Sequence, residues 1–230
     1  MRAAGKGFAV KPSRTQIKIC GVGDVETSHV AAEAGADAIG LMFVEKSPRC
    51  VTGRQAREIV KALPPQVTPI GIFQDQDNGQ VSNYSERVGF NDVQLHGKEN
   101  LEFVASLAGM NIIKAVSFDA SDIERRLEYW DDDTVTLSAI MVDAPAKGDL
   151  AGGTGHALDW SALTSLRMPM DLPLFLAGGL TPDNVGEAIR TVRPWAVDVS
   201  SGVESSRGVK DHELIRAFCA AVREADADAG

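Results

Sequence analysis

The chain has 230 residues, 44% of them hydrophobic and 24% charged, and its formal net charge is −9. This length suits a single domain with a sizeable core. A negative surface repels nucleic acid and anionic membranes, so we expect neither as a partner. No apolar run reaches the ~20 residues that a membrane-spanning helix needs.

The ends of the chain and its cysteines also set expectations. We expect residues 1–14 to be a flexible extension, because this basic, glycine-containing stretch lacks the apolar core of a signal peptide. Residues 15–222 are expected to form one domain, and residues 223–230 a flexible acidic tail. The three cysteines are odd in number and lack metal-ligand spacing, which predicts reduced thiols, a cytoplasmic protein and no metal site.

Short apolar or β-branched runs alternate with amphipathic stretches along the whole chain. The expected strands are Gln16–Cys20, Ala38–Phe43, Thr68–Phe73, Asp92–Leu95, Asn111–Ala115, Ala139–Asp143, Leu174–Ala177 and Ala196–Val199. Near-continuous apolarity is typical of parallel strands that are buried on both faces.

Helix signals lie between these strands. Asp24 can cap a helix that runs through Val30, and Thr181 with Pro182 can begin another. Eight strands that alternate with helices predict an α/β protein with a single (β/α)8 barrel, although an open doubly wound sheet gives a similar pattern with fewer strands.

Glycine clusters follow the late strands. Gly178 and Gly179 follow the seventh expected strand, and Ser200, Ser201 and Gly202 follow the eighth. In barrels, the loops after strands seven and eight commonly hold a phosphate through backbone N–H groups. Each cluster taken alone could be an ordinary turn, as could Gly152–Gly155 after the sixth strand, but two adjacent clusters favour a phosphate site. Such a site also lets an acidic protein bind an anion.

Single polar residues end the apolar strands, where barrel enzymes place their catalytic groups. Cys20 ends the first strand and could be either a small buried hydrophobe or a thiolate base. Asp143 ends the sixth strand, and a helix cap is the alternative to a catalytic carboxylate. Arg49 could hold a carboxylate or be a solvated charge. His96 could be a ligand or a structural histidine.

Seven stretches together resemble the phosphoribosylanthranilate isomerases of tryptophan biosynthesis, and they occur in that family's order. They are residues 17–21 (IKICG), 46–49 (KSPR), 71–73 (GIF), 93–97 (VQLHG), 152–155 (GGTG) with Asp159 and Trp160, 176–180 (LAGGL) and 197–204 (VDVSSGVE).

The resemblance implies an enzyme that carries out the Amadori rearrangement of N-(5'-phosphoribosyl)anthranilate to 1-(2-carboxyphenylamino)-1-deoxyribulose 5-phosphate without a cofactor. It implies Asp143 as the general acid and Cys20 as the general base. Arg49 would contact the anthranilate carboxylate. The remaining implied residues are Gln94, His96 and Asp198 in the pocket, and Gly153, Gly155, Gly178, Gly179, Ser200, Ser201 and Gly202 at the phosphate. The partner is then a small phosphoribosyl substrate, and the protein a monomer or homodimer.

Two alternatives remain at this point. One is a barrel enzyme acting on a neighbouring phosphoribosyl compound, although the first half of the chain lacks a second Gly-Gly cluster for a two-phosphate substrate, and Lys18 and Lys114 lie within strands rather than at their ends. The other is a binding or scaffold protein that keeps the fold without the activity. The presence of both Cys20 and Asp143 favours the enzyme.

Overall fold

The computed structural model describes residues 13–143, 163 and 172–228 of the chain. Eight parallel strands form a closed barrel in which each strand pairs with the next and β8 pairs with β1. They are β1 (Gln16–Cys20), β2 (Ala38–Met42), β3 (Thr68–Phe73), β4 (Asp92–Leu95), β5 (Asn111–Ser117), β6 (Ala139–Asp143), β7 (Leu174–Ala177) and β8 (Ala196–Val199). The expected (β/α)8 barrel is confirmed.

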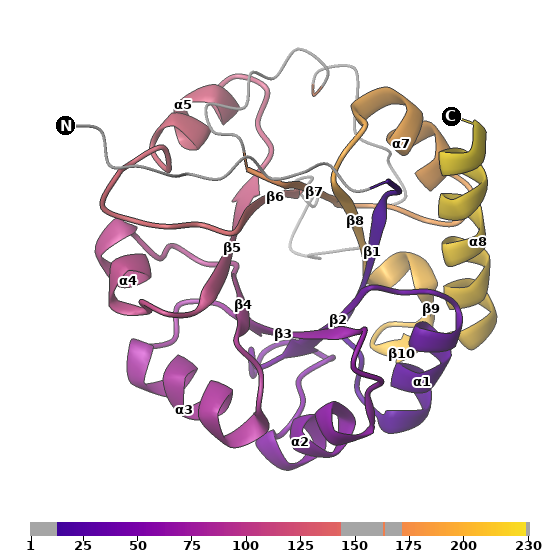
Figure 1. The fold of residues 1–230 in the computed structure, drawn as a ribbon, viewed down its shortest axis with the longest axis horizontal. Helices are drawn as coiled ribbons and strands as arrows, with labels where there is room; N and C mark the ends of the chain where they lie inside the picture. Colours follow the sequence, from indigo (N-terminus) through magenta and orange to yellow (C-terminus); the bar gives the residue numbers. More distant parts are fainter. Residues whose placement is uncertain (1–12, 144–162, 164–171, 229–230) are drawn as a thin grey trace.

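Helices surround the barrel on the outside, as the view down its axis shows (Figure 1). They are α1 (Val25–Glu33), α2 (Gly53–Ala62), α3 (Asn78–Val88), α4 (Leu101–Ser106), α5 (Ile123–Glu128), α7 (Val185–Val192) and α8 (His212–Asp228). Asp24 caps α1 as expected, because its side chain accepts a hydrogen bond from the Thr27 N–H.

Helix α8 differs from the expected acidic tail. It continues to Asp228, so the segment from Arg223 is helical up to that residue. The cause is packing: Ala225 is buried, and the Asp226 carboxylate accepts hydrogen bonds from the Thr15 N–H and hydroxyl beside β1. The acidic composition of this segment does not predict that Ala225 and Asp226 hold it against the barrel.

The start of α7 also differs from expectation. Thr181 was expected to supply the capping hydroxyl, but the helix begins at Val185. Asn184 instead ties the preceding turn together, since its side chain accepts from the Thr181 N–H and donates to the Gly179 carbonyl. The loop after β7 is therefore a rigid turn before the helix starts.

Two apolar layers form the core. The larger layer fills the space between strands and helices, and a smaller one fills the barrel itself. Ile70, Ile113, Met141 and Phe175 belong to the inner layer. Side chains alternate between the two faces of a strand, so each second residue points into the barrel.

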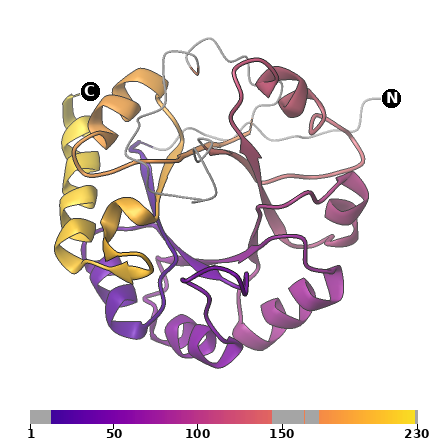
Figure 2. The same cartoon turned by 180° about the vertical axis from the view of Figure 1, so that it is seen from behind.

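This alternation places polar residues inside the barrel. Lys18 precedes Cys20 by two positions, and Asp198 follows the inner-layer residue Ala196 by two. All strands run in the same direction, so their carboxyl ends gather at one mouth of the barrel. The reverse view shows the same ring from its other side (Figure 2).

After η1 (Ser201–Val203), the chain makes a small antiparallel hairpin of β9 (Glu204–Ser206) and β10 (Val209–Lys210). Gly208 packs so closely on the loop after β2 that an added Cβ would lie 2.9 Å from the Pro48 carbonyl oxygen. The hairpin thus brings the residues after β8 against the residues after β2.

Candidate active site

Cys20 ends β1 at the mouth of the barrel, and only 6% of the residue is exposed. Gly40 of the neighbouring strand leaves room for its thiol: a Cβ on Gly40 would lie 3.3 Å from the Cys20 sulfur and 2.7 Å from the Ile72 side chain. The thiol is therefore held in one position by a tightly packed strand pair.

A buried ion pair lies beneath this thiol. The Lys18 ammonium donates to the Asp198 carboxylate over 2.6 Å, with 1% and 9% of their side chains exposed. Burial disfavours a charged lysine, but Asp198 and Cys20 together outweigh it and the pKa of Lys18 is raised. The pair is neutral as a whole, and it holds the Lys18 ammonium near Cys20.

The charges around Cys20 act in opposite directions. Burial is the largest influence and raises the pKa of the Cys20 thiol, while the Lys18 ammonium lowers it. Asp198 raises the pKa further, Lys210 and Arg49 lower it, and the net pKa lies above the ordinary value. Burial thus favours the neutral thiol, while the three cations Lys18, Lys210 and Arg49 are placed to stabilise a thiolate.

A raised thiol pKa has a measurable consequence. We expect iodoacetamide to inactivate the protein slowly at pH 7, with a rate that rises about tenfold per pH unit up to about pH 9, because only the thiolate reacts. The measurement is the rate of activity loss in a Cys50→Ser background, since Cys50 is an exposed thiol. A rate independent of pH over this range would mean that Cys20 is already ionised at pH 7.

Arg49, in the loop after β2, is held by a bidentate ion pair. Its Nε and Nη2 donate to the two oxygens of Glu204 over 2.6 and 2.8 Å. Lys210 also donates to Glu204 over 2.9 Å, and the Gly208 N–H donates over 3.0 Å. Burial raises the pKa of Glu204, but these partners outweigh it and hold that pKa at about 2. Two cations therefore share one carboxylate, and the cluster keeps a net positive charge.

The geometry leaves part of the guanidinium available. Among the described residues only Glu204 accepts hydrogen bonds from the Arg49 side chain, and it uses Nε and Nη2. The aliphatic part of Arg49 lies over Gly21, whose φ is +77° and where a Cβ would come within 2.6 Å of the Arg49 Cδ. Arg49 is thereby directed, with Nη1 left for a ligand next to Cys20.

We expect Arg49→Ala to raise KM for a carboxylate-bearing substrate at least ~10-fold with little change in kcat, because a charge-assisted hydrogen bond to a carboxylate contributes about 1.5–3 kcal/mol to binding. Glu204 keeps Lys210 as a partner in this variant, so the hairpin should stay folded. Steady-state kinetics check this, with thermal unfolding as the control. A loss confined to kcat would contradict the assigned contact.

Asp143 ends β6, on the far side of the barrel mouth from Cys20, since β7 and β8 separate the two strands. Its carboxylate lies 3.2 Å from the His96 Nε2, and the His96 Nδ1 lies 3.0 Å from the Gln94 side-chain amide. With 29% of its side chain exposed, Asp143 can meet a ligand in the mouth. An acid and a base on strands that are not neighbours can act on two sides of one substrate.

The glycine loops after β7 and β8 lie against each other. Gly178 and Gly179 have φ angles of +92° and +66°, which favour glycine. A Cβ on Gly202 would lie 1.9 Å from the Leu180 carbonyl oxygen. Gly202 belongs to the short helix η1, and the first N–H groups of a helix have no partner within it. This concave backbone is suited to a phosphate group.

We expect Gly202→Ala to raise KM at least ~10-fold and to weaken competitive inhibition by inorganic phosphate to the same extent. The added methyl group would collide with the Leu180 carbonyl and force the two loops apart. Gly53→Ala is the matched control, because its Cβ would meet only Tyr84 at an ordinary 3.5 Å. Unchanged phosphate inhibition in Gly202→Ala would place the phosphate elsewhere.

The structure thus brings Cys20, Arg49 and the Ser200–Gly202 turn to one mouth with Asp143 and His96. Gln94 and Asp198 lie deeper, with 1% and 8% exposed. Gly153 and Gly155 lie outside the described residues, so their expected place at the phosphate stays a prediction.

Sequence reasoning missed three charged residues of this site. Lys18 was dismissed because it lies within a strand, although its two-residue spacing from Cys20 places both on the same face. Glu204 was noted only as part of a motif. Lys210 carried no sequence signal, because its contacts depend on the hairpin that returns it to Ser200 and Glu204.

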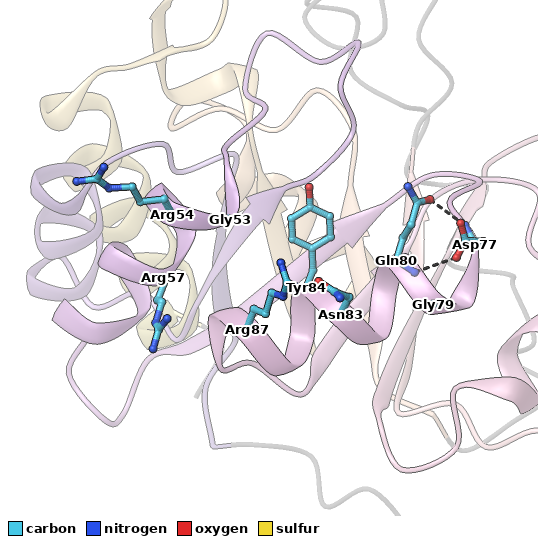
Figure 3. A pocket seen from close by; sticks show the side chains of 9 residues that line it. All are labelled: Gly53, Arg54, Arg57, Asp77, Gly79, Gln80, Asn83, Tyr84 and Arg87. Atoms are coloured by element: carbon cyan, nitrogen blue, oxygen red, sulfur yellow. Dashed lines mark hydrogen bonds between the residues drawn. The ribbon is translucent and has the colours of Figure 1, made fainter.

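A separate pocket lies away from the barrel mouth. It is an open groove between α2 and α3 on the outside of the barrel (Figure 3), and none of the sequence-predicted site residues lines it. Its three arginines are Arg54, Arg57 and Arg87, and Arg54 pairs with the exposed Glu58 on the same helix.

The chain is similar to known proteins over most of its length. Residues 17–221 match the model of the N-(5'phosphoribosyl)anthranilate (PRA) isomerase family. A relative of that name from Pseudomonas fluorescens (strain Pf0-1) is 44% identical over 213 residues, which cover 92% of this chain and 100% of the relative.

Solved structures give the same result. The crystal structure of phosphoribosyl anthranilate isomerase from Thermotoga maritima is similar with a TM-score of 0.83 and 37% identity, covering 91% of this chain and 99% of that one. Another, of the isomerase in complex with reduced 1-(o-carboxyphenylamino)-1-deoxyribulose 5-phosphate, has a TM-score of 0.79 and 36% identity, with 91% and 99% covered. The chain belongs to the N-(5'-phosphoribosyl)anthranilate isomerase family.

Proposed function

We propose that the protein isomerises N-(5'-phosphoribosyl)anthranilate with Asp143 as general acid and Cys20 as general base. Family membership makes the chain a phosphoribosylanthranilate isomerase of tryptophan biosynthesis. The observation that supports the residue roles is the position of a thiol on β1 and a carboxylate on β6 at one barrel mouth, together with an arginine and glycine-rich turns.

The substrate has two anionic ends, which the site can hold separately. The phosphate fits the turn formed by Gly178, Gly179 and Ser200–Gly202. The anthranilate carboxylate fits the Nη1 of Arg49, which Glu204 holds in place. These contacts fix the ribose between Cys20 and Asp143.

The first step opens the ribose ring. Asp143 in its protonated form donates its proton to the ring oxygen. The C1'–O bond breaks, and the nitrogen lone pair forms a C1'=N iminium. The anthranilate nitrogen supplies the electrons, so this step needs no cofactor. Asp143 is left as a carboxylate, which the His96 Nε2–H stabilises from 3.2 Å.

The second step moves a proton from carbon. Cys20 as thiolate takes the C2' proton, and the C2'–H electrons form a C1'=C2' bond while the iminium nitrogen becomes neutral. The enolamine then tautomerises to the ketone: the C2' hydroxyl loses its proton, the C2'=O bond forms, and the electrons of the C1'=C2' bond take up a proton at C1'. Lys18, Lys210 and Arg49 favour the thiolate that this step requires, against the burial that raises the pKa of Cys20.

Membrane association, metal binding, oligomeric state and location are separate questions from the reaction. Among the described residues no helix is both long and apolar enough to cross a membrane. Within the same part of the chain, no three His, Cys, Asp or Glu side chains are grouped so that they could hold a metal ion. The expected monomer or homodimer and the cytoplasmic location stay predictions.

The direct test is the loss of substrate fluorescence on adding purified protein, with EDTA present and no metal or nucleotide added. We expect rapid decay and formation of the ketose product. If a folded protein left the fluorescence unchanged, the assigned reaction would be wrong, and neighbouring phosphoribosyl compounds would be the next substrates to assay.

A further inference from the structure

We infer that Gln94 and His96 are positioning residues that act through Asp143, by fixing which imidazole nitrogen carries the proton and thereby which carboxylate oxygen delivers the acid proton. This inference rests on the proposed role of Asp143 as general acid. The three side chains form one hydrogen-bonded row, from Gln94 to His96 over 3.0 Å and from His96 to Asp143 over 3.2 Å.

The strand arrangement explains how the row can form. Gln94 and His96 are two residues apart at the end of β4, so they share the inner face. Asp143 ends β6, and β5 lies between the two strands. On β5, the inner-layer residue Ala115 pairs with Met141, and Ser117 pairs with Asp143.

The Gln94 amide determines the proton position on the imidazole. Its Nε2 is a donor only, so the His96 Nδ1 opposite it must accept and carries no proton. The neutral imidazole then has its proton on Nε2, where it donates to the Asp143 Oδ2.

The opposite orientation of the amide is less favourable. Gln94 is 1% exposed, and its Oε1 is a buried oxygen without a partner among the described residues. Reversing the amide would give the oxygen a partner but would bury an NH2 group, with two donors, in the same place. The observed orientation therefore leaves fewer buried polar groups without a hydrogen-bond partner.

Two consequences follow for Asp143. Because Oδ2 accepts the His96 proton, the acid proton resides on Oδ1, which fixes the direction of delivery. The carboxylate that forms after ring opening is stabilised by the same bond, so the interaction strengthens as the reaction proceeds and should contribute to kcat rather than to KM. Because 38% of the His96 side chain is exposed, water competes with this bond, and the expected contribution is about tenfold.

Two histidine replacements separate positioning from pocket filling. The amide nitrogen of glutamine occupies about the position of Nε2 and can donate to Asp143, whereas asparagine reaches only the position of Nδ1. We expect His96→Asn to lower kcat about tenfold with KM little changed, and His96→Gln to recover most of that loss. Equal losses in both variants, or a change mainly in KM, would contradict the inference and indicate direct substrate contact.

A double-mutant cycle links the effect to Asp143. The double variant His96→Asn with Asp143→Asn should be no slower than Asp143→Asn alone, because the histidine would act only through the carboxylate. Multiplied losses would overturn the inference. If Asp143→Asn itself kept normal activity, the proposed acid would be wrong instead, so the two failures are distinguishable.

Gln94→Met provides a third measurement. The Gln94 amide is buried and its oxygen has no hydrogen-bond partner among the described residues. Methionine is an apolar side chain of similar length, so the fold should be retained. The substitution should lower kcat several-fold by freeing the imidazole to protonate Nδ1, and this loss should disappear in the His96→Asn background. A loss that persists there would show that Gln94 acts independently of His96, against the inference.

Discussion

Replacing Cys20 by alanine should lower kcat at least ~10²-fold, because a general base accelerates a reaction about 10²–10⁴-fold. No other group of the described site is placed to take the C2' proton of the substrate. The fold should be little affected, since the change removes only one sulfur atom, next to Gly40 of the neighbouring strand. Steady-state decay of substrate fluorescence measures the loss, and circular dichroism checks the fold.

Cys219→Ala is the matched control for this variant. Cys219 is also a buried thiol, but it lies in α8 within the outer apolar layer, where burial raises its pKa to about 11. We expect this variant to lose some stability and to keep kcat. If Cys20→Ala retained near-normal turnover, Cys20 would have only a packing role.

Replacing Asp143 by asparagine should also lower kcat at least ~10²-fold, because the amide cannot supply an acid proton to the ring oxygen. The side chains have nearly the same shape, and the asparagine oxygen can still accept from the His96 Nε2–H, so the barrel mouth should be preserved. KM should change little, since the proposed binding mode places neither anionic end of the substrate on this residue.

Asp92→Asn is the control for the second variant. Asp92 begins β4, a half-buried carboxylate at the other end of the barrel, where burial raises its pKa. The same chemical change there should leave kcat intact. The assigned acid would be wrong if Asp143→Asn turned over substrate as fast as Asp92→Asn does.

Local sequence patterns determined most of the barrel. Six of the eight strands have the bounds that their apolar runs predict, because residues buried on both faces leave a continuous apolar signal. The exceptions are small: β2 ends at Met42, one residue early, and β5 continues to Ser117, two residues late. Both are strand ends, where pairing with a neighbour rather than composition decides the boundary.

The sequence also determined which residues end the strands, and hence that Cys20, Arg49, Asp143 and the glycine turns belong to one mouth. That step needs only the rule that parallel strands of a barrel share a direction. The sequence could not show whether these groups are ionised or already bound to a neighbour. Whether a thiol is ionised or a guanidinium is free depends on charges a few ångströms away, which the order of residues does not reveal.

Only the tertiary structure decided those charges. Arg49 and Glu204 are 155 positions apart, and Lys18 and Asp198 are 180 apart. Closing the barrel brings β8 next to β1, and the hairpin after β8 folds back over the loop after β2. The sequence thus specified a barrel with a carboxylate, a thiol and glycine-rich turns at one mouth, while the closure of the barrel supplied the ion pairs that orient the arginine and place cations near the buried cysteine. The physical reason is that electrostatic interactions depend on distance in space, whereas the hydrophobic pattern that predicts strands depends on residues that are neighbours in the sequence.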